Sequence, residues 1–344
     1  MIIGKEKVKQ LSVTQQQLSD AYQWLYQQRK HFPANADIWT LRRDWESNKH
    51  QLLQQINQGR YLFLPLKRIC KENGHIIHLW TSQDALVMKV LATIIQPHLK
   101  LSKTCKHIKG QGGLKQGVSE LQHQLPHYQF VFKTDVKHYY ETIDQIILSE
   151  QIHQQIGNKY LKRYLWQIIR RTVEYGGNYQ EITKGISRGC PLSPLLGGLY
   201  LTRLDETLSQ NKNIYTIRYM DDICILAKTR WHLRTAIKQL NQQFNALKVK
   251  QHPDKTFIGR IEKGFDFLGY WLEPHRPLTP SQVSLTRLTD RSRQLLERTA
   301  SIARLRQYVQ RWLQWHLSGL RGLTDKRRRF EWYWRYVLDN YVVT

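Results

Sequence analysis

Two consecutive aspartates, Asp221 and Asp222, stand between two apolar, β-branched runs in the segment IYTIRYMDDICILAK. This pattern predicts a β-hairpin with buried arms and with both acids on its turn. Adjacent carboxylates repel each other and resist desolvation, so their presence there is accounted for if divalent cations neutralise them. The alternative is an ordinary Asp-Asp turn. The segment is therefore expected to be a buried hairpin within a β-sheet. Its turn is a candidate metal site.

A third acid favours the metal interpretation. Asp135 ends the apolar run FVFKTD, and a strand beside the hairpin would bring it to the same cations. Three carboxylates can hold two ions about 3.5–4 Å apart, which aligns an attacking 3′-hydroxyl with a leaving pyrophosphate. Mg²⁺ suits such oxygen ligands, and Mn²⁺ is the alternative.

The composition indicates what kind of partner the chain has. The formal net charge is +26 over 344 residues, with basic residues spread along the whole chain, which favours a polyanion and nucleic acid first. No apolar run approaches the roughly 20 residues of a membrane span, and the N-terminus lacks a signal-peptide core, so we expect a cytoplasmic protein with no membrane partner. The four widely spaced cysteines are expected to be buried thiols, neither zinc ligands nor disulfides: Cys70, Cys105, Cys190 and Cys224.

The order of patterns along the chain predicts alternating helices and strands. Helical spacing fills the first sixty residues or so, with Ser12 or Thr14 as a cap. Two β-rich runs then flank the turn KENG and predict a hairpin. Near the end, the proline-dense segment LEPHRPLTPSQV precedes a basic, tryptophan-rich region that is expected to be helical.

Five motifs carry a resemblance to a known family. In chain order, KTDVKHYY, GISRGCPLSPLLGGLYL, RYMDDICIL, HPDKTFIG and FDFLGYWL resemble the palm motifs of bacterial reverse transcriptases, most of all those of the group II intron-like lineage. We expect a freestanding enzyme of that lineage without an endonuclease domain. The resemblance implies an α+β right-hand polymerase with fingers, a palm built on an antiparallel sheet with flanking helices, and a helical thumb. The expected division is a helical N-terminal extension (1–60), fingers (61–128), palm with part of the fingers (129–272) and thumb (273–344).

The resemblance also implies catalytic roles. It assigns the two metal ions to three carboxylates and one backbone carbonyl, those of Asp135, Asp221, Asp222 and Val136. It matches Lys255 in HPDKT to a lysine that protonates or neutralises the leaving pyrophosphate, although a solvated surface lysine is the alternative.

The family pattern places Tyr140 beneath the incoming sugar, where its ring would exclude a ribose 2′-hydroxyl and so select dNTPs. RNA-copying RNA polymerases usually carry an acid near that point, so Tyr140 argues against them. A core tyrosine is the other interpretation. If the stretch is extended, the neighbouring Tyr139 points to the opposite face. Asp144, further along, is expected to cap the next helix instead of binding metal.

Other substrate contacts are expected on glycines and cations. Ser193-Pro194 is predicted to start a helix, and the preceding glycines, Gly185 and Gly189, permit close backbone approach. Further contacts with the triphosphate or with template phosphates are expected from three basic side chains near these motifs: Arg68, Lys71 and Arg188.

The resemblance implies RNA template, DNA product and dNTPs as partners, and a thumb that clamps the hybrid through its backbone. A structured noncoding RNA is an expected further partner, as in a domesticated enzyme of antiphage defence, and a second protein or a homo-oligomer is open. The alternatives are a mobile-retroelement reverse transcriptase and a non-catalytic RNA-binding scaffold with the same fold.

Overall fold

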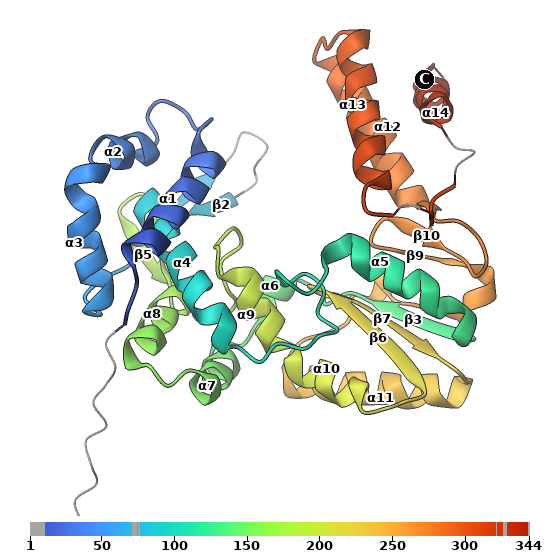
Figure 1. Ribbon diagram of the computed structural model, residues 1–344, viewed down its shortest axis with the longest axis horizontal. Helices are drawn as coiled ribbons and strands as arrows, with labels where there is room; N and C mark the ends of the chain where they lie inside the picture. Colours follow the sequence, from blue (N-terminus) through green and yellow to red (C-terminus); the bar gives the residue numbers. More distant parts are fainter. Residues whose placement is uncertain (1–10, 71–73, 75, 321, 326–328, 343–344) are drawn as a thin grey trace, which may run out of the picture. The chain divides into compact units, whose positions relative to one another are not determined.

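The aspartate hairpin is present as expected, in a four-stranded antiparallel sheet with the order β6-β7-β3-β8. Its strands are β3 (Phe130–Thr134), β6 (Ile214–Tyr219), β7 (Asp222–Ala227) and β8 (Phe257–Arg260). The two central strands, β3 and β7, are the most buried, which suits their β-branched and aromatic residues. In Figure 1, α5 (Gly113–Gln124) lies on one side of this sheet and α11 (Arg230–Ala246) on the other.

The computed structural model describes residues 11–70, 74, 76–320, 322–325 and 329–342. The chain divides into two units. The first combines residues 1–102, 137–203 and 244–250, and the second combines 103–136, 204–243 and 251–344. Two helices run across this division, α10 (Thr202–Ser209) and α11.

The first unit is mainly helical. Its helices are α1 (Gln15–Arg29), α2 (Asp37–Arg43), α3 (Trp45–Asn57), α4 (Ser82–Ile95), η1 (Gln96–His98), α6 (Tyr139–Thr142), α7 (Gln145–Gln155), α8 (Lys159–Ile169) and α9 (Ser193–Tyr200). Capping explains several of their starts. Thr14 forms a capping box with Gln17, Asp144 accepts hydrogen bonds from two amides of α7, and Pro194 stands at the start of α9. These three expectations are confirmed.

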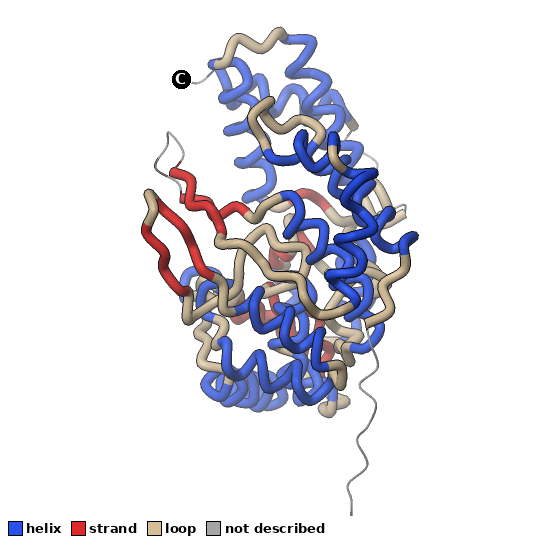
Figure 2. Tube along the Cα trace, turned by 90° about the vertical axis from the view of Figure 1, so that its left-hand side faces the viewer, coloured by secondary structure: helices blue, strands red, loops and turns tan. Residues whose placement is uncertain are grey.

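The sheet of the first unit has the order β2-β1-β4-β5 and is antiparallel except between β1 and β4. Its strands are β1 (Leu66–Cys70), β2 (Ile76–Leu79), β4 (Thr172–Tyr175) and β5 (Asn178–Glu181). The two hairpins run side by side in Figure 2. Most of their side chains are exposed, and Cys70 is among them, so the expectation that all four cysteines are buried is wrong for Cys70. The other three thiols are buried.

The rest of the second unit contains a small sheet, three short helices and, after the sheet, three long helices. The sheet order is β11-β10-β9, with β9 (Phe265–Phe267), β10 (Tyr270–Leu272) and β11 (Thr279–Pro280). The short helices are η2 (Leu125–His127), η3 (Pro253–Lys255) and η4 (Ile261–Lys263), and the long ones are α12 (Gln282–Glu297), α13 (Ile302–Leu317) and α14 (Phe330–Val342).

Two hydrophobic clusters stabilise this unit. In the first, Val118 and Leu121 of α5 pack with Val131 of the large sheet and with Tyr270 of β10. The second lies among α12, α13 and α14, around buried residues such as Leu288. The helical C-terminal region expected from the sequence is therefore present, and FDFLGYWL forms the apolar β9–β10 hairpin.

The α+β class with an antiparallel sheet is confirmed. The division into N-terminal extension, fingers, palm and thumb stays a prediction. Among the described residues, no helix has the length and apolar character needed to cross a membrane.

Candidate active site

The three expected carboxylates converge because of strand register. β3 and β7 pair so that Thr134 lies opposite Ile223. One step further in this antiparallel register, Asp135 lies opposite Asp222, whose backbone also pairs with Tyr219 across the hairpin. Asp222 is the first residue of β7, so of the two acids only Asp221 lies in the turn, next to Met220. The expectation that both acids lie on the turn is therefore wrong for Asp222.

A buried ion pair holds the turn. Arg218 of β6 is only 1% exposed, and its guanidinium forms three hydrogen bonds of 2.6–3.1 Å to the Asp205 carboxylate of α10. Its Nη1 also donates to the carbonyl of Met220 at 2.8 Å, while the amide of Met220 lies 3.0 Å from Nδ1 of His107. Met220 has φ +57, a left-handed conformation that a non-glycine residue adopts only when its surroundings hold it there. Arg218 and His107 supply this support, and Asp221 follows directly.

Burial and mutual repulsion shift the titration of the hairpin acids. Burial, followed by the neighbouring Asp135 carboxylate, raises the pKa of Asp221 to about 7. Burial and Asp135 likewise raise the pKa of Asp222 to about 6, against the opposing effect of Lys255 and Lys133. The site therefore favours cations.

Lys255, at the end of η3, supplies one of these cations. Its Nζ donates to Oδ2 of Asp135, and this contact, followed by the charges of Asp222 and Asp221, keeps the pKa of Lys255 above its usual value. The structure thus brings together Asp135, Asp221, Asp222 and Lys255, as the sequence predicts.

Lys133 is a second cation at the site and was not expected from the sequence. It lies on β3, two residues before Asp135, which directly follows the strand, so both side chains are expected on the same face. Its Nζ contacts Oδ1 of Asp266 on β9 at 2.5 Å and the Asp266 carbonyl at 2.9 Å. The two-residue spacing between Lys133 and Asp135 is the sequence signal that indicates a place for Lys133 at the site.

The oxygen donors of the site fit a divalent cation. Oδ1 of Asp135 is buried and accepts no hydrogen bond from any described residue, so it remains able to ligate. Val136 pairs with Gln251 in a bridge whose hydrogen bonds come from the flanking residues, so its own carbonyl faces away from Gln251. Within the described ranges, however, no three His, Cys, Asp or Glu side chains are arranged to hold one ion. The acids would therefore have to move before three of them could share an ion.

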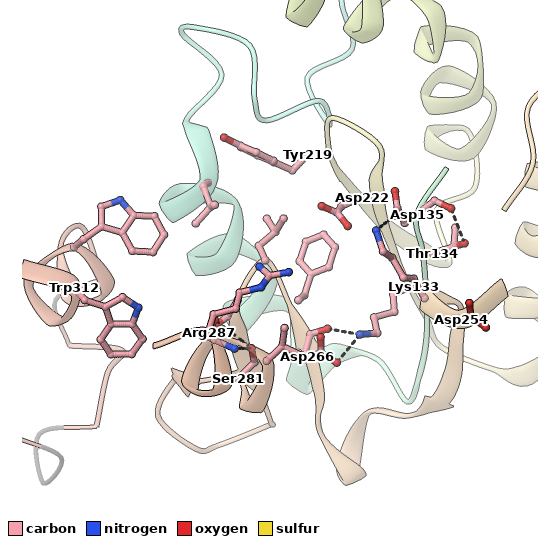
Figure 3. Close-up of a pocket in the computed structure, with 18 residues that line it drawn as sticks. Lys133, Thr134, Asp135, Tyr219, Asp222, Asp254, Asp266, Ser281, Arg287 and Trp312 are labelled. Carbon is pink, nitrogen blue, oxygen red and sulfur yellow. Dashed lines mark hydrogen bonds and ion pairs between the residues drawn. The ribbon is translucent and has the colours of Figure 1, made fainter. Parts of the chain in front are cut away.

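A cavity of about 830 Å³ adjoins the acids. In Figure 3, Asp135 and Asp222 lie at one end of it and Trp312 at the other, with Asp266 and Arg287 between them. The cavity therefore connects the carboxylates to the β9–β10 hairpin and to helices α12 and α13, all in one unit.

The candidate sugar-selecting residue lies in the first unit. Tyr139 and Tyr140 belong to the short helix α6, and their ring centroids are 5.6 Å apart. A Cβ atom on Gly197 of α9 would lie 3.1 Å from the Tyr140 ring and 3.2 Å from the Tyr139 ring. The expectation that the two rings point to opposite faces is therefore wrong, because the stretch is helical instead of extended. Tyr139 is buried and donates its hydroxyl to the Gly197 carbonyl, whereas Tyr140 is half-buried.

The remaining candidates that the structure describes lie in the first unit as well. Gly185 (φ +74) packs against the backbone of Tyr140, where a Cβ would come within 2.7 Å of a carbonyl oxygen, so its close approach is to the chain itself. Gly189 (φ +77) has no described atom within 4 Å of a Cβ position. Arg188 pairs with Glu141 at 3.1 Å. Arg68 of β1 stacks on Tyr175 with 4.6 Å between guanidinium carbon and ring centroid, and Lys71 lies outside the described residues.

Comparison with known proteins agrees with this geometry. The family model "Reverse transcriptase (RNA-dependent DNA polymerase)" matches residues 71–272, which is more than half of the chain. The chain is 20% identical to Protein YkfC of Escherichia coli (strain K12) over 266 residues, 64% of this chain and 70% of that protein.

Two further relatives are named for introns. The chain is 21% identical over 174 residues to the group II intron-encoded protein LtrA of Lactococcus lactis subsp. cremoris, and 19% identical over 173 residues to the putative COX1/OXI3 intron 1 protein of Saccharomyces cerevisiae (strain ATCC 204508 / S288c). Each match takes 48% of this chain but only 29% and 21% of the relative. From the family match over the residues that carry the carboxylates, the chain belongs to the reverse transcriptase family, the RNA-directed DNA polymerases.

Proposed function

We propose that this chain extends a 3′-hydroxyl with dNTPs on an RNA template, using two Mg²⁺ ions held by Asp135, Asp221 and Asp222 and by the carbonyl of Val136, with Mn²⁺ as a substitute. The observation that carries the proposal is that Asp135, directly after β3, neighbours both Asp222, the first residue of the paired strand β7, and Asp221 on the adjoining turn. When bound, the ions would activate the 3′-hydroxyl and neutralise the leaving pyrophosphate.

The chain's own residues supply the rest. Lys255, held at the Asp135 carboxylate, neutralises or protonates the leaving pyrophosphate. In the other unit, Tyr140 excludes the ribose 2′-hydroxyl. Phosphate or base contacts are proposed for four residues that lie near the expected motifs: Arg68, Lys71, Arg188 and Gly189.

The test compares wild type with Asp221→Ala and Asp222→Ala on a primed RNA template. We expect each variant to lose Mg²⁺-dependent incorporation while keeping RNA binding, because the acids hold metal whereas lysines and arginines hold the backbone. Asp339→Asn, an exposed acid of α14, is the charge-matched control and should keep activity. Full extension by either alanine variant would refute the assignment.

We further propose a domesticated role beside a structured noncoding RNA, for example in antiphage defence in the cytoplasm. The alternatives are a mobile-retroelement enzyme, which the two intron-named relatives favour, and a non-catalytic scaffold, against which the three retained aspartates argue. Sequencing the RNA and DNA that copurify with the protein separates these roles. Size-exclusion chromatography with light scattering tests for a second protein or a second copy of the chain.

A further inference from the structure

Lys115 of α5 makes an unusual set of contacts for a lysine. Its Nζ donates to the hydroxyl of Tyr270 on β10, to the carbonyl of Trp315 at 2.6 Å and to the carbonyl of His316 at 3.0 Å. An ammonium has three N–H donors, so all three are used. Nζ also lies 4.0 Å from the ring centroid of Trp315 and 5.0 Å from that of Tyr270. One side chain therefore joins α5, β10 and α13.

The carbonyls that Lys115 contacts are in the last turn of α13. The final four carbonyls of a helix have no partner within it, and the helix dipole is negative at this end, so a cation there is stabilising. The hydroxyl of Tyr270 also donates to the His316 carbonyl at 2.7 Å. Just beyond the helix, Gly319 (φ +74) lies so close that a Cβ on it would be 3.3 Å from Cβ of Lys115. The C-terminal end of α13 is thus held by a specific polar contact.

Among the described residues, no acidic side chain pairs with Lys115. Burial lowers the pKa of Lys115 to about 8. From α13, His316 faces it with a ring that is buried and has no hydrogen-bond partner among the described residues, and burial followed by Lys115 lowers the pKa of His316 to about 3. From β10, the facing group is Tyr270, whose pKa burial raises.

The held end of α13 forms part of the cavity next to the carboxylates. Trp312 and Trp315 line this cavity, and Trp315 is itself one of the residues that Lys115 contacts. Leu114, next to Lys115 on α5, lines it too.

We propose that Lys115 is a positioning residue that fixes the end of α13, and with it the tryptophan wall of the cavity, so that the enzyme retains its primer–template duplex between successive additions. This inference rests on the proposed function. The proposed role of Lys115 is to retain the duplex, not to take part in the chemical step. Lys115 contacts Tyr270, Trp315 and His316, and it does not contact the aspartates.

The experiment measures Lys115→Met against wild type, with Lys238→Met as control, because Lys238 is an exposed lysine of α11 in the same unit. At pH 7.5 we expect Lys115→Met to raise the KM for primer–template about tenfold, equivalent to roughly 1.4 kcal/mol. Products made in the presence of a polyanion trap should shorten. The rate of the first addition at saturating duplex should stay within about twofold. Lys238→Met should match wild type in all three measurements.

A pH series distinguishes this role from a merely structural one. As pH rises through about 8, wild-type Lys115 loses its proton, so the difference in KM between wild type and Lys115→Met should be clearly smaller at pH 9 than at pH 7.5. Tyr270→Phe, which removes one partner of the ammonium, should change KM in the same direction but less. If Lys115→Met does not fold, Tyr270→Phe carries the same comparison.

The inference is overturned if Lys115→Met leaves KM unchanged, slows the first addition as much as it raises KM, or keeps the same KM ratio at pH 9. Equilibrium binding of an RNA–DNA duplex, measured without dNTPs, gives a second readout. If wild type incorporates no nucleotide, the proposed function fails, whereas the duplex affinities still test Lys115.

Discussion

Asp221→Asn is expected to stabilise the protein while it abolishes polymerisation. In the folded chain, burial and the Asp135 carboxylate raise the pKa of Asp221 from 3.8 to about 7, so the ionised form is disfavoured at neutral pH. Asparagine has the shape of the protonated acid and can donate a hydrogen bond to Asp135. The substitution therefore removes a repulsion that the catalytic arrangement requires.

The pKa of Asp221 sets the size and the sign of the effect. The pKa of the Asp221 carboxyl rises from 3.8 to about 7 on folding. Full ionisation of such a group lowers the free energy of unfolding of the protein by up to roughly 4 kcal/mol. Asp221 is only partly buried, so solvent screening reduces this to on the order of 1–2 kcal/mol. The pKa of Asp221 is higher in the folded chain than in the unfolded chain. The contribution of its protonated carboxyl to the free energy of unfolding is therefore fully present below about pH 4 and is lost as pH rises through about 7.

The assay is thermal unfolding of wild type and Asp221→Asn in EDTA, from pH 5 to pH 8.5. We expect the variant to unfold roughly 2–6 °C higher at pH 8.5, with a smaller difference at pH 5. Adding Mg²⁺ should stabilise wild type more than the variant and narrow the gap. A variant that unfolds below wild type at pH 8.5, or whose advantage is larger at pH 5, would refute the reasoning.

Three further predictions concern other residues of the two units. Tyr140→Ala should raise the ratio of rNTP to dNTP incorporation on one primed RNA template, because the ring that excludes the 2′-hydroxyl is gone. Lys255→Met should tighten Mn²⁺ binding to the free protein about fivefold or more in a paramagnetic-resonance titration, because its ammonium and a metal ion compete for Oδ2 of Asp135. Arg218→Met should lower the free energy of unfolding by about 3–5 kcal/mol in urea, because it leaves Asp205 buried and unpaired.

Each of these has a matched control. Tyr139→Phe removes only the hydroxyl bonded to the Gly197 carbonyl, so it should leave the sugar ratio unchanged. Lys133→Met also removes a positive charge, but that ammonium is held by Asp266, so its effect on Mn²⁺ affinity should be smaller. Adding Asp205→Leu to Arg218→Met should recover part of the lost stability. If a variant and its control change the measured quantity equally, the reason given for that variant is refuted.

The convergence of the acids was predictable because both segments have unambiguous local patterns. An apolar run that ends in Asp135 reads as a buried strand, and two such runs around Asp221 and Asp222 read as a hairpin. Side-chain caps such as Thr14 and Asp144 were predictable for the same reason, since their partners lie within three residues.

Contacts over long distances in sequence were not predictable. Arg218 reads as an exposed position within a strand, and its partner Asp205 stands on a different element. Lys133 and Asp266 are 133 residues apart. The four-residue helix α6 is not predictable because one helical turn has no periodicity to detect, so the sequence pattern suggests an extended stretch for Tyr139 and Tyr140.

The exposed thiol of Cys70 is a site for selective chemical labelling of the protein. Burial raises the pKa of Cys105 and of Cys190 to about 11, and it raises that of Cys224 as well, so these thiols form little of the reactive thiolate. A maleimide fluorophore should therefore label Cys70 in preference to the other three. Because Cys70 ends β1, two residues after Arg68, a dye there would report on that strand when RNA is added, without any engineered cysteine.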